Sequence, residues 1–239
     1  MKTKARKIAI AGATGMVGQA FLRLLEENFF QDAEIILLAS KKSKGKKVKF
    51  RKKEYIIEDL SEYDFTGTDL ALFSAGASVS AEFAPKAVSQ GCVVVDNSSC
   101  FRYEKDVPLI VPEVNGKVVL DYQLPGIIAN PNCSTIQMLV ALKPIHDAFN
   151  IQRIDVTTLQ AVSGTGKEAT EELLSQLDSY HGSTEQKSDI YAKQIANNVL
   201  PHCDIFEDNR YTKEENKLVK ETHKILDSKI QVTATCVRV

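Results

Sequence analysis

The chain has no long hydrophobic run and no strong charge imbalance. None of its apolar stretches approaches the roughly 20 residues that a membrane-spanning helix needs, and its formal net charge is −1 at pH 7. A domain that binds nucleic acid normally carries a basic excess. The basic N-terminus precedes a short apolar run that stops at Gly12, without the apolar region or cleavage site of a signal peptide. We therefore expect a cytoplasmic protein that binds neither a membrane nor nucleic acid.

The chain is also poor in residue patterns that build disulfide frameworks or metal sites. Its five cysteines are odd in number and widely spaced, and no CxxC is present. Its four histidines show no HExxH or other ligand spacing, so we expect no metal site. What remains is a chain of 239 residues, 44% of them hydrophobic, which suits two modest domains or one large one.

The first half of the chain alternates short, continuously apolar runs with amphipathic stretches. Expected strands are residues 7–11, 34–39, 69–74, 92–96 and 126–130, with a helix at 80–89. Continuous apolar strands that alternate with helices indicate a parallel sheet covered on both faces. The sequence therefore predicts the α/β class, in the form of a Rossmann-type doubly wound parallel sheet.

The second half of the chain has a more mixed pattern. Strands are expected at 154–162 and 229–239, and helices at 136–149, 167–180 and 211–226. Thr212, followed three residues later by Glu215, predicts a capping box at the start of the last helix. The change of pattern predicts a first domain at residues 1–131 and a second at 132–239.

Three glycines follow the first expected strand as a GxxGxxG pattern, Gly12, Gly15 and Gly18. Glycine permits a tight turn and a close backbone approach, and the helix N-terminus that follows can receive a pyrophosphate. Packing glycines alone can produce this spacing, but the strand–turn–helix context favours a dinucleotide site. The second strand is followed by Ser40 and lysines rather than by an acidic residue, which favours NADP over NAD.

Nine Lys and Arg residues lie between residues 41 and 53. We expect most of them to form a solvated basic segment. A nucleic-acid patch is the alternative, but no pattern of stacking aromatic residues accompanies these charges.

Cys133 stands where an apolar run meets an amphipathic helix pattern. The positive field at a helix N-terminus favours a thiolate, and a thiolate there is a nucleophile for acyl chemistry. The alternative is a small residue at an ordinary strand-to-helix turn, since a free cysteine often behaves as a buried small hydrophobe.

The motifs together resemble the aspartate-semialdehyde dehydrogenases, over residues 7–239. The most specific of them is Asn130-Pro131-Asn132-Cys133-Ser134-Thr135. The other segments that carry the resemblance are residues 12–18, 74–80, 96–102, 111–115, 160–166 and 236–239. The resemblance implies a homodimer in which the first domain binds NADP and the second, an α+β domain, serves catalysis and dimerisation. It also implies reversible, NADP-dependent conversion of aspartyl phosphate to aspartate semialdehyde through a Cys133 thioester, in the biosynthesis of lysine (by way of diaminopimelate), threonine and methionine.

The resemblance also implies roles for individual residues. Gln160 would orient the intermediate, Arg102 would hold the phosphate, and Arg238 would hold the substrate carboxylate, because a guanidinium matches an oxyanion. Glu214 and Lys217 would lie near the substrate amine and the phosphate, although their spacing fits an ordinary surface ion pair equally well. Asn132 is the remaining residue that the resemblance places in the substrate-binding site. The cofactor set is Gly12, Thr14, Gly15, Met16, Val17, Ser40, Lys42, Ser43, Ser74, Ala75, Ser163 and Gly164.

The chain departs from the family at its end. The family continues beyond the last strand with a histidine that acts as general acid and base and with further strands and a helix, whereas this sequence stops at Val239. We therefore expect an incomplete second domain, an exposed sheet edge at 229–239 and a proton-transfer loss of order a hundred- to ten-thousandfold. Two alternatives remain open: an inactive homologue that binds nucleotide or a partner subunit, and another acyl-phosphate or acyl-CoA reductase of the same superfamily.

Overall fold

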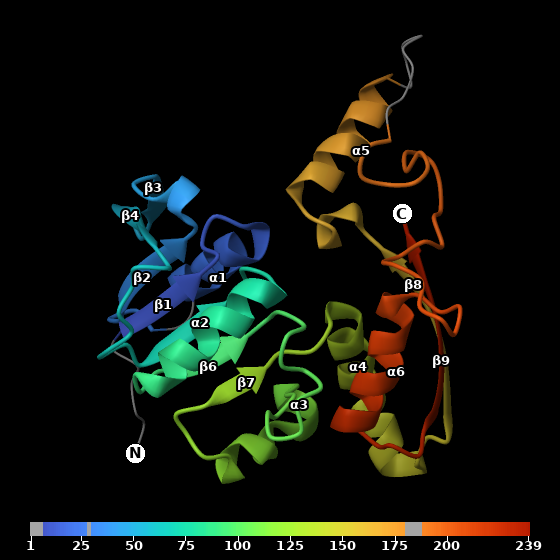
Figure 1. Ribbon diagram of the computed structural model, residues 1–239. Helices are drawn as coiled ribbons and strands as arrows, with labels where there is room; N and C mark the ends of the chain where they lie inside the picture. Colours follow the sequence, from blue (N-terminus) through green and yellow to red (C-terminus); the bar gives the residue numbers. More distant parts are fainter. Residues whose placement is uncertain (1–6, 28–29, 180–187) are drawn as a thin grey trace. The chain divides into compact units, whose positions relative to one another are not determined.

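The computed structural model describes residues 7–27, 30–179 and 188–239 (Figure 1). The chain splits into two compact units, Met1–Pro131 and Asn132–Val239. His181 and the end of the helix expected at 167–180 lie outside the described residues. No helix within the described ranges is long and apolar enough to cross a membrane.

The first unit is built around a seven-stranded sheet with the order β3-β4-β2-β1-β5-β6-β7. Every neighbouring pair is parallel except β3 and β4. The elements are β1 (Lys7–Ala11), α1 (Met16–Glu27), β2 (Glu34–Ala39), η1 (Lys41–Ser43), β3 (Lys47–Phe50), β4 (Lys53–Asp59), β5 (Leu70–Phe73), α2 (Ala77–Ser89), β6 (Val93–Asp96), α3 (Pro112–Asn115), η2 (Gly116–Asp121) and β7 (Ile127–Ala129). The predicted doubly wound α/β class is confirmed.

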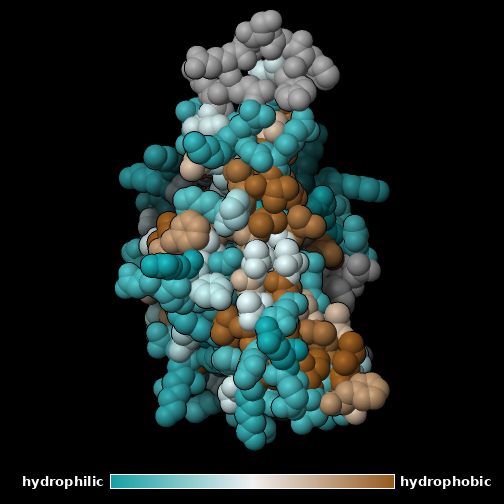
Figure 2. All heavy atoms as spheres, turned by 90° about the vertical axis from the view of Figure 1, so that its right-hand side faces the viewer, coloured by the Kyte–Doolittle hydropathy of each residue, from teal (hydrophilic) through white to brown (hydrophobic). Residues whose placement is uncertain are grey.

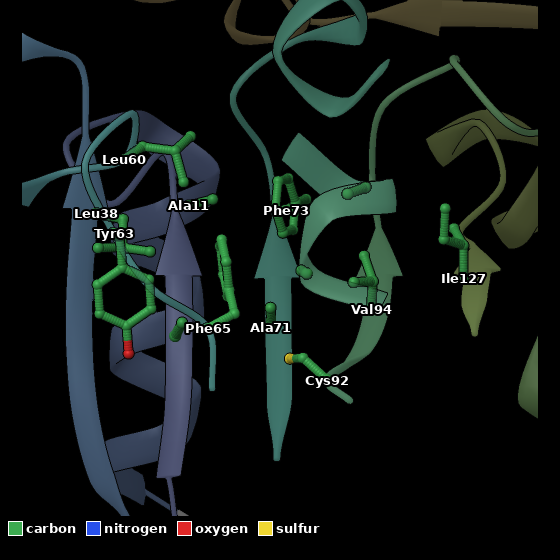
Figure 3. Close-up of a cluster of buried hydrophobic side chains, with 13 residues drawn as sticks. Ala11, Leu38, Leu60, Tyr63, Phe65, Ala71, Phe73, Cys92, Val94 and Ile127 are labelled. Carbon is green, nitrogen blue, oxygen red and sulfur yellow. The ribbon is translucent and has the colours of Figure 1, made fainter. Parts of the chain in front are cut away.

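Both faces of this sheet are covered, as the continuous apolar runs predicted. In β1, Ile8 and Ile10 pack into one buried cluster, while Ala9 and Ala11 pack into another. Because successive side chains of a strand point to opposite faces, the two clusters lie on opposite sides of the sheet. Figure 3 shows the second cluster, in which Phe73 on β5 is fully buried.

The basic segment at residues 41–53 forms more structure than the sequence predicted. Within it, η1 is followed by a hairpin of β3 and β4, turned by Arg51 and Lys52 at φ 48° and 60°. Phe50 is 3% exposed and Ile57 is fully buried against the sheet. The hairpin joins the sheet because β4 pairs in parallel with β2, with Ile57 opposite Leu37, while lysine side chains remain at the surface. The expectation that most of these basic side chains are solvated is confirmed, but the backbone that carries them is ordered.

The second unit pairs β8 and β9 in parallel along their whole length, from Arg153 opposite Gln231 to Gln160 opposite Arg238. Its elements are α4 (Cys133–Phe149), β8 (Arg153–Gln160), η3 (Val162–Gly164), α5 (Lys167–Ser179), α6 (Lys213–Ile225) and β9 (Gln231–Arg238). The capping box predicted at Thr212 and Glu215 is present at the start of α6. It helps to fix the helix that carries several polar groups of the site described below.

Candidate active site

A pocket of about 460 Å³ lies at the carboxyl ends of the parallel strands of the first unit. This is the edge where open α/β sheets bind ligands. Predicted cofactor residues in its lining are Gly12, Thr14, Gly15, Ser40, Ser74 and Ala75, and further lining residues are Ala39, Lys41, Asp59, Leu60, Ser61, Val79 and Phe83. The pocket therefore combines the ends of β1, β2, β4 and β5 with the start of α2.

The first and third glycines of the turn are required by close packing. Gly12 has φ +89°, and a Cβ at this position would overlap the backbone oxygen of Ser74. A Cβ on Gly18 would overlap the backbone oxygen of Gly12. A Cβ on Gly15 would have only the backbone oxygen of Gly12 nearby, at 3.4 Å, so the backbone of Gly15 is open toward a ligand. This turn leaves room for a pyrophosphate at the start of α1.

Four predicted cofactor residues of the first unit are absent from the lining of this pocket. Met16 and Val17, each 40% exposed, occupy the first turn of α1. Lys42 and Ser43 lie in η1, directly after Lys41, which does line the pocket. The sequence analysis missed Asp59, Leu60 and Ser61, at the end of β4, and Phe83 on α2, because no local motif marks these positions.

The first unit also holds Arg102, the predicted phosphate-binding residue. Arg102 is 7% exposed, and its Nη2 donates to the backbone oxygen of Asn97 at 3.1 Å. The segment before it is fixed by Asp96, which is fully buried and accepts hydrogen bonds from the hydroxyls of Ser80 and Ser98 at 2.7 and 2.6 Å. Arg102 is thus anchored just beyond the end of β6.

Cys133 is the first residue of α4, and Asn132 is its N-cap. The Asn132 Oδ1 accepts hydrogen bonds from the backbone N–H groups of Ser134 and Thr135, at 2.9 and 3.4 Å. The backbone N–H of Asn132 donates to Glu221 at 2.7 Å. Cys133 is exposed at a well-fixed helix N-terminus, where the helix dipole favours negative charge.

Cys133 lines an open pocket of about 540 Å³ in the second unit. Of the predicted site residues, Gln160, Ser163, Gly164 and Arg238 line the same pocket. These residues come from the start of α4, the ends of β8 and β9, and η3. The structure therefore brings together residues as far apart in the chain as Cys133 and Arg238.

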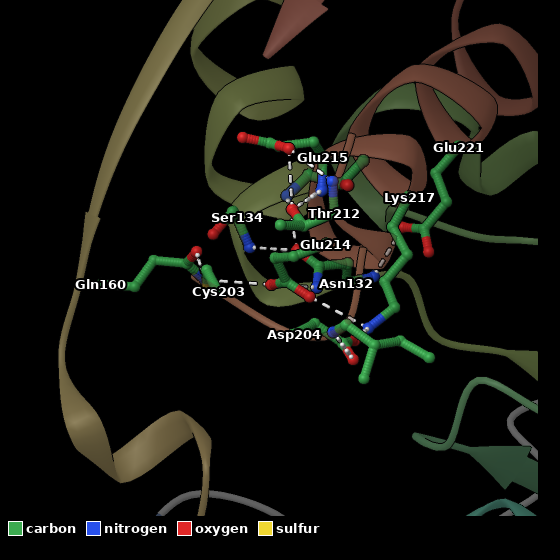
Figure 4. Close-up of polar contacts among 12 residues, drawn as sticks. Asn132, Ser134, Gln160, Cys203, Asp204, Thr212, Glu214, Glu215, Lys217 and Glu221 are labelled. Atoms are coloured by element: carbon green, nitrogen blue, oxygen red, sulfur yellow. Dashed lines mark hydrogen bonds and ion pairs between the residues drawn. The ribbon is translucent and has the colours of Figure 1, made fainter. Parts of the chain in front are cut away.

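Behind this pocket, the buried carboxylate of Glu214 joins three other predicted residues (Figure 4). Glu214 Oε1 accepts hydrogen bonds from Asn132 Nδ2 at 2.8 Å and Gln160 Nε2 at 2.9 Å, and its Oε2 lies 3.0 Å from Lys217 Nζ. Burial raises the pKa of Glu214, but the Gln160 hydrogen bond and the Lys217 charge outweigh it, so the pKa is lowered. Because Glu214 is only 7% exposed, the surface-ion-pair alternative is wrong.

Lys217 is held from two sides. Its Nζ lies 2.9 Å from Asp204 Oδ2 and 3.0 Å from Glu214 Oε2. Burial lowers the pKa of Lys217, but the Glu214 charge and the Asp204 hydrogen bond together raise it by more. The net shift of the Lys217 pKa is therefore upward. Lys217 therefore stays a fixed cation. Asp204 was missed by the sequence analysis because no motif signals its role.

Arg238, at the end of β9, is 8% exposed and lies against the loop after β8. Its Nη1 donates to the backbone oxygen of Ala161 at 2.8 Å. A Cβ on Gly164 would lie 2.9 Å from the same Nη1, so glycine permits this approach. The Arg238 Nε is buried and has no hydrogen-bond partner among the described residues. A buried donor without a partner in a pocket wall suits an anionic ligand.

No group of three or more His, Cys, Asp and Glu side chains within the described ranges could hold a metal ion. The polar groups of both pockets instead suit organic anions, with backbone N–H groups at helix starts and fixed cations.

Two family models match the chain. One, described as "Semialdehyde dehydrogenase, NAD binding domain", matches residues 7–122, and the other, described as "Semialdehyde dehydrogenase, dimerisation domain", matches residues 142–239. An aspartate-semialdehyde dehydrogenase of Legionella pneumophila is 57% identical over 97% of this chain and 67% of its own length. That of Aquifex aeolicus is 53% identical over 98% of this chain and 69% of its own.

The solved structures that this chain resembles belong to the same enzymes. Aspartate semialdehyde dehydrogenase II of Vibrio cholerae, in a complex with ASA, has a TM-score of 0.96 at 48% identity over 99% of this chain and 71% of its own. The Candida albicans enzyme with NADP has a TM-score of 0.71 at 29% identity, over 98% of this chain and 68% of its own. The predicted resemblance is confirmed: this chain belongs to the aspartate-semialdehyde dehydrogenase family.

Proposed function

We propose that the chain catalyses the reversible, NADP-dependent conversion of aspartyl phosphate to aspartate semialdehyde and phosphate, with Cys133 as nucleophile. The observation that carries the proposal is the position of Cys133. It is exposed on the first residue of α4 and lines one pocket with Gln160 and Arg238. Family membership gives the substrate, because the relatives are named for aspartate semialdehyde.

The covalent steps begin at the sulfur of Cys133. Its thiolate attacks the acyl carbon of aspartyl phosphate, the acyl–oxygen bond breaks, and phosphate leaves with the electron pair of that bond. A thioester on Cys133 remains, which divides one difficult displacement into two easier steps. NADPH, when bound, supplies the hydride that reduces this acyl group. The resulting thiohemiacetal then releases the aldehyde and regenerates the Cys133 thiolate.

The remaining side chains bind and orient the substrate. Gln160 is proposed to donate to the acyl oxygen, where negative charge develops during attack. Arg238, with its unpartnered Nε, is proposed to hold the substrate carboxylate. Lys217 and Arg102 are proposed to hold the phosphate, and Glu214 to face the substrate amine. Glu214 also fixes Asn132, the residue before the nucleophile.

The first unit is proposed to bind NADP. Its glycine turn fits a pyrophosphate, because a Cβ on Gly12 would overlap the neighbouring backbone while Gly15 is left open. Ser40 and Lys41 line the pocket at the end of β2, with Lys42 and Ser43 next to them, and are proposed to hold the 2′-phosphate. Ser74 and Ala75 would border the nicotinamide end. Met16, Val17, Ser163 and Gly164 remain predicted cofactor contacts.

We also propose a homodimer formed through the second unit, where the dimerisation-domain model matches. Figure 2 shows hydrophobic patches on the side where Figure 1 draws β9. Exposed apolar residues of this unit include Leu159, Leu174, Val199, Ile205 and Phe206. Light scattering tests the dimer. A cytoplasmic location stays a prediction, which cell fractionation would test.

The direct test is a spectrophotometric assay of the 239-residue chain with aspartate semialdehyde, phosphate and NADP⁺. We expect NADPH formation that requires phosphate and is lost in Cys133→Ala. Replacement of phosphate by coenzyme A, and of the aldehyde by other semialdehydes, tests the related reductases. NADPH binding without turnover in any of these mixtures would contradict the proposal and favour a nucleotide-binding homologue.

A further inference from the structure

The Cys203 thiol has a defined contact that the reaction proposed above does not use. Cys203 is 1% exposed, and its Sγ lies 3.1 Å from Oε1 of Gln160. It belongs to a loop tied to β9, because Leu200 and Arg238 exchange both backbone hydrogen bonds, at 2.9 and 2.8 Å. We propose that Cys203 is a positioning residue that fixes the orientation of the Gln160 amide. This proposal rests on the role proposed above for Gln160.

The amide of Gln160 has two nearly isosteric orientations, and its partners decide between them. Its Nε2 faces Glu214 Oε1 at 2.9 Å. The lowered pKa of Glu214 keeps this carboxylate ionised at neutral pH, so it only accepts. The opposite orientation would place the amide oxygen against the negative charge. Glu214 therefore fixes the nitrogen of the Gln160 amide.

The oxygen of the same amide is held by two donors, Cys203 and Thr158. Burial raises the pKa of the Cys203 thiol to about 11, with the Arg238 charge offsetting it in part, so the thiol keeps its proton. Thr158 Oγ1 lies 3.2 Å from Gln160 Oε1, but its hydroxyl also hydrogen-bonds to Cys236 and has a single proton. Cys203 is thus the more constant donor to the oxygen.

The contact matters because Gln160 lines the pocket of Cys133. Without the Cys203 donor, the oxygen of the amide would rest on the shared Thr158 proton. The side chain could then swing about its last torsions, and its N–H would spend less time aimed at the acyl oxygen. Loss of one such hydrogen bond corresponds to about a five- to tenfold effect.

The structural test is the side-chain amide signal of Gln160 in a ¹⁵N-labelled chain, assigned by its loss in Gln160→Ala. We expect Cys203→Ala to shift or broaden this signal. Cys92→Ala is the control, because Cys92 is also a fully buried cysteine, but it belongs to the core cluster of the first unit and contacts neither Gln160 nor Thr158 in the described network. An unchanged signal in Cys203→Ala, or equal changes in both variants, would overturn the proposal.

If Cys203→Ala does not fold, Cys203→Ser replaces it. The hydroxyl is a stronger donor than the thiol, so the Gln160 signal must move, whereas in Cys92→Ser it must not. Identical spectra for Cys203→Ser and the unchanged chain would contradict the proposed contact.

Kinetics test whether the orientation matters for the reaction. We expect Cys203→Ala to lower kcat about five- to tenfold with KM for NADP⁺ unchanged, and Cys203→Ser to restore kcat. In a Gln160→Ala background the Cys203→Ala change should have no further effect. An equal decrease in that background would show that Cys203 acts through stability instead. If Gln160→Ala itself turns over normally, the role proposed for Gln160 fails, and the amide signal still decides whether Cys203 orients it.

Discussion

The two pockets of this chain are built in different ways. The pocket of the first unit is lined by the ends of parallel strands and by a glycine turn, and its shape depends on backbone atoms such as the Ser74 oxygen. The pocket of the second unit depends on side chains, with the Glu214 carboxylate joining Asn132, Gln160 and Lys217. The pocket of the first unit, which is shaped by backbone atoms, should therefore be sensitive to substitutions that add side-chain volume. The pocket of the second unit should instead be sensitive to substitutions that remove a hydrogen-bond donor or acceptor.

Loss of the nucleophile should have the largest effect. Cys133→Ala removes the atom that forms the thioester, so we expect turnover to fall on the order of a thousandfold or more. NADPH binding, measured by fluorescence titration, should be unchanged, since the cofactor pocket lies in the first unit. Cys100→Ala is the control, because this cysteine lies in neither pocket lining, and it should retain full turnover.

Added volume in the glycine turn should strongly weaken nucleotide binding while the second unit keeps its structure. Gly12→Ala places a Cβ into the Ser74 backbone, so we expect NADPH affinity to fall by about a hundredfold or more. Gly91 has a similar φ, +88°, but an added Cβ there has no neighbour within 4 Å. Gly91→Ala should cost only about 1 kcal/mol of stability and leave NADPH binding intact. Equal loss of binding in both variants would contradict the close-packing explanation.

A charge change at the end of β2 should have a smaller, more selective effect. Lys41→Ala should weaken NADPH binding about tenfold and leave NADH binding nearly unchanged, because a charge-assisted contact to the 2′-phosphate is lost. Lys49→Ala removes an exposed lysine of the same basic segment that does not line the pocket, and it should change neither affinity. An equal loss of affinity for NADPH and NADH would show that Lys41 does not bind the 2′-phosphate.

Acid should weaken the second unit through Glu214. The pKa of this carboxyl is lowered in the folded chain, since its hydrogen bonds and the Lys217 charge outweigh burial. Its stabilising contribution is therefore present above the unfolded pKa of about 4.3 and is lost as pH falls through the folded value. We expect the urea midpoint to fall more steeply below about pH 4 in the unchanged chain than in Glu214→Gln. Parallel pH profiles for the two proteins would contradict this role.

The sequence was informative where the structure depends on neighbours in the chain. The strands at 7–11 and 34–39, the glycine turn and the Thr212 cap all follow from short local patterns, and each is observed as predicted. The hairpin of β3 and β4 was missed because charged residues interrupt its apolar positions. Its position depends instead on the pairing of β4 with β2, in which Ile57 lies opposite Leu37.

The network behind the second pocket could be predicted only in part. Asn132 meets Glu214 across 82 residues and Glu221 across 89, and Cys203 meets Gln160 across 43. Such contacts arise from the pairing of β8 with β9 and from the packing of α6, which no motif encodes. The family resemblance named Glu214 and Gln160, but nothing in the sequence pointed to Cys203 or to Glu221.

The most direct test of the central claim is the mass of the chain after incubation with aspartate semialdehyde and NADP⁺ without phosphate. Oxidation of the aldehyde should then stop at the acyl-enzyme, because the acceptor of the acyl group is absent. We predict one aspartyl adduct per chain, located on the peptide that contains Cys133, together with one equivalent of NADPH. Formation of NADPH without an adduct on Cys133, or an adduct that persists in Cys133→Ala, would contradict the proposed mechanism.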